Sequence, residues 1–212
     1  MGAITSELST AASPLLAYLP HEVLFHQEAP CHRQVFLIRQ GLVGTFWGGR
    51  RQGKRYLEIL GPGDPLGAEC RCNEAWACQA QTLTQVEGWW LKEEGWLALL
   101  RQRGLLERFR QRRMDQLRRF YAWGELLAYG SVRARVAWRL LDLAERFGRD
   151  AGGRVFVPLH MTQERCAELV GATRPVVARA LQYFQEQGWV ILGQEGFEVS
   201  DRKALKEQSL EG

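Results

Sequence analysis

A long apolar run is the first feature that this 212-residue sequence lacks, since no stretch of about 18 apolar residues occurs in it. A secretory signal opens with a basic segment, yet no basic residue precedes Arg33. We therefore expect a cytoplasmic protein with neither an export signal nor a membrane as partner.

Enzyme motifs are missing as well. The sequence has no glycine-rich phosphate loop, no serine nucleophile elbow and no HExxH metal motif. No pair of carboxylates stands out as a general acid and base. We therefore expect a protein that is not an enzyme.

Cysteine is sparse, with only five residues in the chain: Cys31, Cys70, Cys72, Cys78 and Cys166. In a chain without an export signal, thiols are expected to stay reduced. We therefore expect no disulfide bond to stabilise the fold.

Charge is divided unevenly along the chain. Residues 1–100 carry 8 Lys and Arg against 10 Asp and Glu, whereas residues 101–212 carry 20 against 14. A basic half suits a polyanionic partner such as nucleic acid, although an ordinary solvated surface accounts for the same excess.

Residues 21–92 have the pattern of a β domain. Short apolar runs at 35–38, 43–47 and 56–60 alternate with turn-forming residues, and 82–91 forms a last strand-like stretch. Several short strands at regular spacing predict a sandwich, barrel or jelly roll.

Residues 93–129 have a helical pattern with one apolar stripe. Eight arginines between positions 101 and 119 leave the rest of this region solvated. The stripe packs either on the chain's own core or on a second copy, and we favour the second copy. The predicted dimer interface consists of Leu106, Phe109, Leu117, Phe120, Gly124 and Leu127.

Gly130 and Ser131 interrupt this pattern, and residues 132–147 resume helical spacing. A glycine-rich link at 148–153 and a short strand at 154–159 follow. The predicted organisation is a β domain over 1–92, a helical region that we expect to dimerise over 93–129 and a third domain over 130–212.

Residues 161–199 have the pattern of a winged helix-turn-helix. Thr162 is a good N-cap for a first helix, Gly171 supplies a turn, and Thr173 can cap a second helix with Pro175 in its first turn. Strand-like residues 189–192 and 197–199 flank a glycine-rich turn, which predicts a hairpin wing.

Residues 161–199 also carry polar side chains of the types that bind DNA. Arg174, Arg179 and Gln182 lie away from the apolar stripe of the second helix. Arginine can donate two hydrogen bonds to a guanine edge in the major groove. The Thr162 hydroxyl and the start of the first helix can hold a phosphate. We therefore expect double-stranded DNA as the partner.

Residues 161–164 and 167–181 resemble the helix-turn-helix of the CRP/FNR family of bacterial regulators almost position for position. More weakly, residues 61–67 resemble the family's turn before its effector pocket, 93–129 its dimerisation helix and 132–144 the helix that opens its DNA-binding domain. The resemblance implies an α+β fold with a β-roll (jelly-roll) sensor domain. It also implies a homodimer, a near-palindromic operator and RNA polymerase as a partner.

The resemblance carries roles to individual positions. Arg174 and Arg179 match the family's base-reading arginines, and Thr162 matches a phosphate contact. Gln163 stands where the cyclic-AMP receptor has a basic contact residue, and Thr173 and Gln182 complete the predicted DNA-binding set. Pro175 replaces a glutamate that reads a base in many members, so the operator preference at that base pair is left open.

The effector pocket departs from the family's cyclic-AMP pattern of a Gly-Glu pair and, about ten residues later, an Arg-Ser pair. Gly67 is followed by Ala68, so that Glu69 comes one place late, and Arg71 is the only cation nearby. We therefore do not expect cyclic AMP to bind in the usual mode.

Four cysteines of the sensor region offer other chemistry: Cys31, Cys70, Cys72 and Cys78. Thiolates can bind zinc, an iron–sulfur cluster or haem, and they can act as redox switches. In one haem-dependent branch of the family, a cysteine and a histidine two residues apart lie in this region, which Cys70 and Cys72 resemble. Packing with no ligand and constitutive DNA binding stay equally open.

Overall fold

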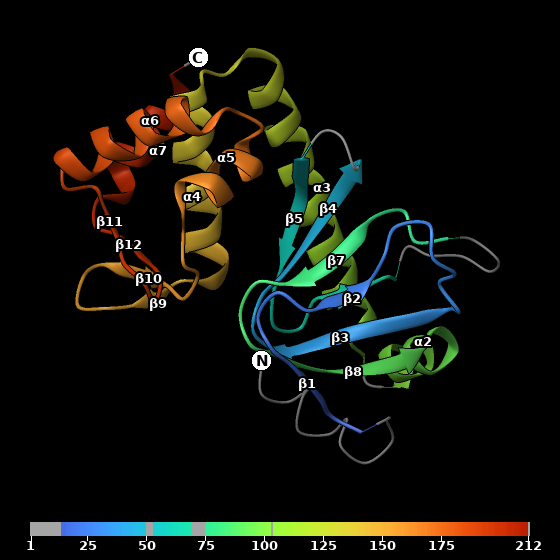
Figure 1. The fold of residues 1–212 in the computed structure, drawn as a ribbon. Helices are drawn as coiled ribbons and strands as arrows, with labels where there is room; N and C mark the ends of the chain where they lie inside the picture. The colour runs from blue at the N-terminus through green and yellow to red at the C-terminus, as the bar shows by residue number, and fades with distance from the viewer. Residues whose placement is uncertain (1–13, 50–52, 69–74, 103, 212) are drawn as a thin grey trace. The chain divides into compact units, whose positions relative to one another are not determined.

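The computed structural model describes residues 14–49, 53–68, 75–102 and 104–211. The chain forms two compact units, one ending at Gln111 and one beginning at Arg112 (Figure 1). The predictions for Glu69, Cys70, Arg71 and Cys72 lie outside the described residues.

The first unit contains two four-stranded sheets in which every recorded pairing is antiparallel, in the orders β1-β8-β3-β6 and β2-β7-β4-β5. This arrangement confirms the predicted jelly-roll type of sensor domain. The strands are β1 Leu16–Tyr18, β2 Val23–Phe25, β3 Gln34–Gln40, β4 Val43–Gly49, β5 Gly53–Leu60, β6 Pro65–Leu66, β7 Gln79–Thr82 and β8 Val86–Lys92.

Strand β3 is buried on both of its faces. Phe36 and Ile38 join a core cluster that draws residues from both sheets, whereas Val35 and Leu37 pack with Trp96 on the other side. Successive side chains of a strand point to opposite faces, so this alternation places the second cluster outside the sandwich. Helix α2 (Glu93–Gln102), which carries Trp96, covers that outer face.

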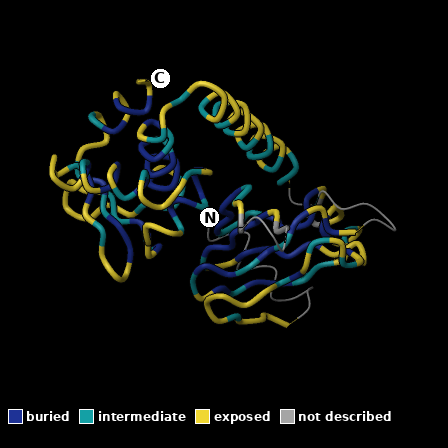
Figure 2. The backbone as a smooth tube through the Cα atoms, turned by 45° about the horizontal axis from the view of Figure 1, so that its top comes forward, coloured by how far each residue is buried: buried dark blue, intermediate teal, exposed yellow. Residues whose placement is uncertain are grey.

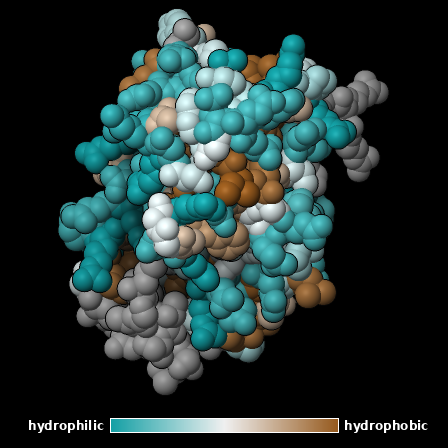
Figure 3. Space-filling model, turned by 90° about the vertical axis from the view of Figure 1, so that its left-hand side faces the viewer, coloured by the Kyte–Doolittle hydropathy of each residue, from teal (hydrophilic) through white to brown (hydrophobic). Residues whose placement is uncertain are grey.

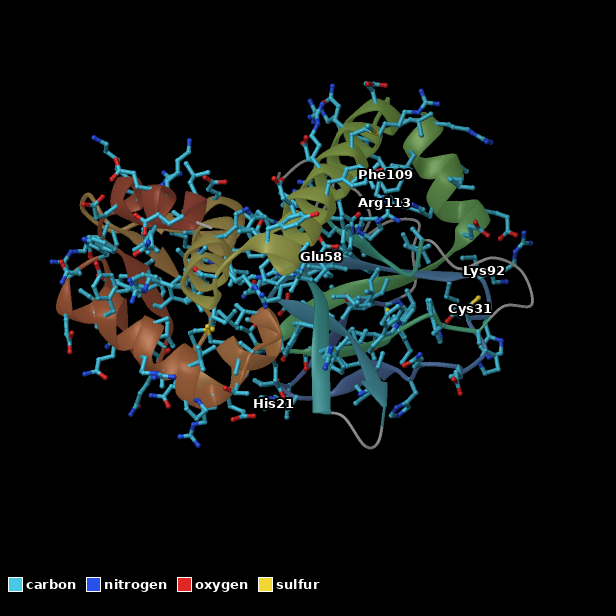
Figure 4. The ribbon with its side chains drawn as sticks, turned by 90° about the horizontal axis from the view of Figure 1, so that it is seen from above. His21, Cys31, Glu58, Lys92, Phe109 and Arg113 are labelled. Atoms are coloured by element: carbon cyan, nitrogen blue, oxygen red, sulfur yellow. The ribbon has the colours of Figure 1, made fainter. Side chains whose placement is uncertain are left out.

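The helical region predicted over 93–129 is divided in two. Helix α2 ends at Gln102 and α3 begins at Leu106, with Gly104 between them at a φ of 63°. Only glycine adopts this left-handed conformation without strain, so the backbone can turn here. Phe109 of α3, labelled in Figure 4, contacts Trp96 edge-on at 5.8 Å between ring centroids.

The second unit packs helices against a small sheet of order β11-β12-β10-β9. Its elements are α4 Val132–Phe147, β9 Arg149–Asp150, β10 Val155–Val157, α5 Gln163–Val170, α6 Arg174–Glu186, β11 Val190–Leu192, β12 Phe197–Val199 and α7 Arg202–Leu210. The sequence analysis did not anticipate α7, which buries Leu205 and pairs Arg202 with Glu145 of α4 at 3.7 Å.

Candidate nucleic-acid interface

The first helix of the helix-turn-helix begins and ends as predicted. The Thr162 hydroxyl accepts a hydrogen bond from the Arg165 backbone N–H at 3.0 Å, which caps α5. Gly171 ends the helix in the left-handed conformation, with φ at 63° and ψ at 42°. The Thr162 oxygen is used as an acceptor, so its hydroxyl proton stays available to donate to a phosphate.

Thr173 precedes α6 in the extended conformation of an N-cap, but its side chain makes no capping hydrogen bond. Thr173 is therefore the N-cap residue of α6, as predicted, although its hydroxyl takes no part in the cap. Pro175 has no backbone N–H to donate, and the N–H groups of Val176 and Val177 both donate to the Thr173 carbonyl at 3.1 Å. The Thr173 carbonyl oxygen therefore accepts the hydrogen bonds at the start of α6, in place of the Thr173 hydroxyl oxygen.

Helix α6 has one buried stripe and one exposed face. Its buried residues are Val177, Ala180, Leu181 and Phe184, as the sequence predicted. Arg174, Arg179 and Gln182 are all exposed. Because the apolar stripe is buried, Arg174 and Arg179 lie on the part of α6 that remains in contact with solvent.

The exposed side chains of α6 differ in how they are held. Arg174 Nε donates to Gln163 Oε1 at 3.3 Å, which links the starts of α5 and α6. Gln182 donates to Glu186 at 2.8 Å, one turn further along the same helix. Arg179 makes no side-chain hydrogen bond or ion pair with another described residue, so its guanidinium is free to meet a base edge.

The predicted wing is the hairpin of β11 and β12. The Gly193 N–H donates to the Gly196 carbonyl at 2.8 Å, and Gln194 and Glu195 are exposed at the tip. A Cβ on Gly196 would lie 2.1 Å from the Val157 carbonyl oxygen, so only glycine fits there. Figure 3 views the side on which α6 and the wing lie in Figure 1, and hydrophilic residues cover most of the face shown.

The residues predicted to form a dimer interface divide into two groups. Leu106 and Phe109 are partly buried against the core cluster of the first unit that contains Trp96. Leu117, Phe120 and Leu127 remain 42–43% exposed, and no residue of α3 is buried among those described (Figure 2). Gly124 has open space around its Cβ position.

A buried charged cluster, which the sequence analysis missed, joins the second half of α3 to α4. Asp142 lies 3.5–3.6 Å from guanidinium nitrogens of Arg119, Arg139 and Arg146. The Asp142 and Arg139 side chains are each only 6% exposed. We call these four residues the Asp142 cluster.

Two tryptophans continue the Asp142 cluster. Trp123 of α3 stacks on Trp138 of α4 at 5.4 Å, and the Arg139 guanidinium lies 4.2 Å from the centre of the Trp123 ring. Cation–π contacts of this kind are attractive, the more so when buried. The C-terminal half of α3 is therefore attached to α4 by charge and by ring stacking.

Trp76 fills the space beside Gly67 in the region of the expected effector pocket. Gly67 has a φ of 86°, and a Cβ on it would lie 2.4 Å from the Trp76 ring. Trp76 is 6% exposed and stacks on Phe25 with ring centroids 3.9 Å apart. An indole therefore occupies the position next to the pocket glycine.

The described cysteines are not equivalent. Cys31, labelled in Figure 4, is disulfide-bonded, contrary to the expectation that no disulfide forms, while Cys78 and Cys166 are buried and form no disulfide. A sequence gives no direct sign of which thiols meet in space, and that proximity decides the bond. A cysteine in a disulfide has no thiolate to donate to a metal.

Cys166 behaves as a packing residue on the buried face of α5. Burial raises the pKa of the Cys166 thiol to about 12, and the nearby charge of Arg139 lowers it by a smaller amount. The thiol thus stays protonated and unreactive near neutral pH.

The described residues form neither a candidate metal site nor a helix that could span a membrane. Among residues 14–49, 53–68, 75–102 and 104–211, no three His, Cys, Asp or Glu side chains come together as a metal site would need. In the same part of the chain, no helix combines the length and apolar character of a membrane span.

Two family models match the chain. A cyclic nucleotide-binding domain matches residues 15–103, and a Crp-like helix-turn-helix domain matches residues 134–208. The two matches fall on the jelly roll and on the winged helix-turn-helix.

Curated relatives point to the same family. The cyclic AMP receptor protein of Thermus thermophilus is 30% identical over 175 residues, which are 82% of this chain and 78% of that protein. A CRP-like cAMP-activated global transcriptional regulator of Mycobacterium tuberculosis is 43% identical over 79 residues. That match covers 37% of this chain and only 35% of the length of the relative.

Solved structures share the fold. FixK2 from Bradyrhizobium japonicum has a TM-score of 0.75 at 19% identity, covering 94% of this chain and 98% of that one. A transcriptional regulator of the CRP/FNR family from Thermus thermophilus has a TM-score of 0.74 at 23% identity, covering 92% and 98%. The chain belongs to the CRP/FNR family of transcription regulators, as the resemblance of its helix-turn-helix predicted.

Proposed function

We propose that this chain regulates transcription by binding double-stranded DNA as a homodimer, with α6 of each copy reading one half of a near-palindromic operator. The observation that carries the proposal is the face of α6. Arg174 and Arg179 are exposed opposite a fully apolar stripe, in a helix-turn-helix whose first helix is capped by Thr162. Arginine side chains on an exposed recognition helix suit guanine edges in the major groove.

The dimer rests on α3. A helix of 24 residues without one buried residue among those described leaves an apolar stripe of Leu117, Phe120 and Leu127 facing water. Such a stripe is stabilised by a second copy of the same helix. Two recognition helices about 34 Å apart would then enter successive major grooves.

Control by cyclic AMP in the usual mode is not part of the proposal. The buried Trp76 indole beside Gly67 disfavours a nucleotide at that place. We propose instead either a signal read by sensor-domain cysteines, through a metal, an iron–sulfur cluster, haem or thiol chemistry, or DNA binding with no ligand. The disulfide at Cys31 favours thiol chemistry among these. Contacts with RNA polymerase and a cytoplasmic location follow from the family and stay proposals.

The test is operator selection. The full chain is used to select binding sites from random duplexes, and affinity is then measured by fluorescence anisotropy on the selected site and on random DNA. We expect a near-palindromic site and an affinity that falls as salt rises. Failure of the chain to prefer any duplex, with or without reductant and with or without added cyclic AMP, would refute the proposal.

Arg179→Ala tests the reading role directly. Loss of a two-bond contact to a base should weaken operator binding by about 1–3 kcal/mol while leaving binding to random DNA nearly unchanged. The anisotropy titrations above measure both affinities. Equal losses on the two duplexes would show that Arg179 contacts a phosphate instead of a base.

A further inference from the structure

We propose that Arg133, at the start of α4, is a phosphate-binding residue that holds the DNA backbone beside the C-terminal half of the recognition helix. The proposal rests on the proposed function, because it assumes that α6 enters a groove of DNA. Neither the apolar pattern of α4 nor the predicted DNA-binding set pointed to this residue.

The position of Arg133 is fixed by an aromatic contact. Its guanidinium carbon lies 4.4 Å from the centre of the Tyr183 ring, and Tyr183 belongs to α6. The Tyr183 ring is itself held edge-on by Trp189 at 5.6 Å. A cation over an aromatic face is attracted by the ring. This contact therefore holds Arg133 against the flank of α6 instead of leaving it to move freely in solvent.

Tyr183 lies one helical turn beyond Arg179. Residues four apart on a helix are neighbours on its surface, so Arg179 and Tyr183 share one side of α6. Arg133, lying over the Tyr183 ring, therefore adds a second cation on the side of α6 that carries Arg179. A residue from α4 thus contributes to the surface that α6 presents.

The guanidinium of Arg133 keeps its donors available. Stacking uses the face of the guanidinium plane, while its N–H groups point outward in that plane. Arg133 is exposed and has no ion pair with any other described residue. Arg135, two residues on, differs, because it donates to the Gly130 and Leu127 carbonyls and so caps the end of α3.

Groove dimensions place a phosphate near this end of α6. The helix has 13 residues and is therefore about 20 Å long, whereas the major groove is about 12 Å wide. A recognition helix places its N-terminal residues against base edges, so the opposite end of α6, which carries Tyr183, lies farther from the bases and closer to a backbone strand. The positive end of the α4 dipole, capped by Ser131, adds a favourable field for a phosphate at the same place.

The test compares salt dependence in the full chain. Affinity for the selected operator and for random DNA is measured from low to moderate salt with wild type and Arg133→Ala. Each neutralised phosphate contributes about 0.9 to the slope of log affinity against log salt, so two copies should lower its magnitude by about 1.8. We expect this loss on both duplexes, because a phosphate contact carries no sequence information.

Two controls separate the role of Arg133 from a general loss of charge or fold. Arg202→Ala removes an exposed arginine that is already paired with Glu145, and its slope should match wild type. Tyr183→Phe keeps the ring beneath Arg133 and should also match wild type. Unfolding curves of all variants check that the fold is retained.

An unchanged salt slope in Arg133→Ala would overturn the inference, and so would a loss confined to the operator, which would indicate a base contact. If wild type itself prefers no duplex, the proposed function fails instead. The two failures are therefore distinguishable in one set of titrations.

Discussion

Gly67 is a residue whose identity is set by its backbone conformation and by the packing around it in the first unit. The sequence analysis treated it as part of an effector pocket, because family members that bind cyclic AMP have a glycine there. In the structure its positive φ and its contact with Trp76 both require the absence of a side chain. The residue thus has a packing role that does not depend on any ligand.

Gly67→Ala should lower the free energy of unfolding by about 2 kcal/mol or more, because the new methyl meets the Trp76 ring and the backbone is strained. Urea denaturation followed by tryptophan fluorescence measures the change. Gly95→Ala is the control, because Gly95 lies in α2 and a Cβ added there would have no other heavy atom within 4 Å. That variant should be stabilised by up to about 1 kcal/mol. Equal stability of the two variants would contradict the role of Trp76.

Cys166 gives a pH prediction at the same scale. The folded thiol has its pKa raised from 9.0 to about 12. Between these values the unfolded chain loses the proton and the folded chain keeps it. Stability conferred by the buried thiol is therefore fully present below pH 9 and is lost as pH rises toward 12, at about 1.4 kcal/mol per pH unit at most.

Cys166→Ala removes this titration. Its free energy of unfolding should decline less steeply than that of wild type between pH 9 and pH 12. Urea denaturation at a series of pH values measures both curves, and other groups that titrate in this range affect the two proteins alike. Parallel curves would mean that the Cys166 thiol is not protected by burial.

At the scale of elements, the joint between α3 and α4 is the feature that sequence patterns could not reveal. Glycine and serine at 130 and 131 predicted the end of one helix and the start of the next, and the structure confirms the second helix over Val132–Phe147. The contacts across the joint come from arginines that look solvated in sequence. Only the packing of two helices brings Arg119 and Arg146 to the same carboxylate.

Asp142→Asn should destabilise the second unit by about 3 kcal/mol, since it removes the counter-charge of buried guanidinium groups while keeping the shape of the side chain. Urea denaturation gives the free energy, and near-ultraviolet circular dichroism reports on the Trp123–Trp138 stack. Glu145→Gln is the matched control, because its pair with Arg202 is exposed and should contribute less than about 0.5 kcal/mol. A variant at Asp142 as stable as the control would show that the cluster contributes nothing to the joint.

At the scale of the whole molecule, the exposed apolar stripe of α3 favours assembly of two chains into a dimer. Its exposed apolar residues are unfavourable in water, and covering them with a second helix removes that surface from solvent. The proposed homodimer and the proposed spacing of its two recognition helices both depend on this one stripe.

Phe120→Glu should therefore produce a folded monomer, because Phe120 is 43% exposed within the single chain. A charge in the seam should weaken the dimer by about 2 kcal/mol or more, and operator affinity should fall with it. Sedimentation velocity measures the assembly, and anisotropy measures DNA binding.

Arg118→Glu is the control for that change. Positions 118 and 120 lie about 200° apart around a helix, so the same carboxylate is placed on the other side of α3. This variant should remain a dimer. Monomers from both variants, or from neither, would show that Phe120 does not lie in the interface.

The sequence by itself determined the family of this protein and most of its elements, although not α7 or the break between α2 and α3. Helices α4, α5 and α6 follow from caps, glycine turns and apolar spacing, all of which act over a few residues. The same local signals placed Arg174 and Arg179 on the exposed side of α6. The β domain was predicted as a class of sheet, because alternating runs specify strands but not their order.

The tertiary structure determined which residues, distant along the chain, contact one another. The stacking of Trp76 on Phe25, the disulfide at Cys31, the Asp142 cluster and the contact of Arg133 with Tyr183 all join residues or elements whose proximity no local pattern encodes. Such contacts arise only when whole elements pack, since packing brings together side chains that are distant along the chain. Local patterns therefore identified the helix that we propose to read DNA, and packing alone placed an arginine of α4 beside it.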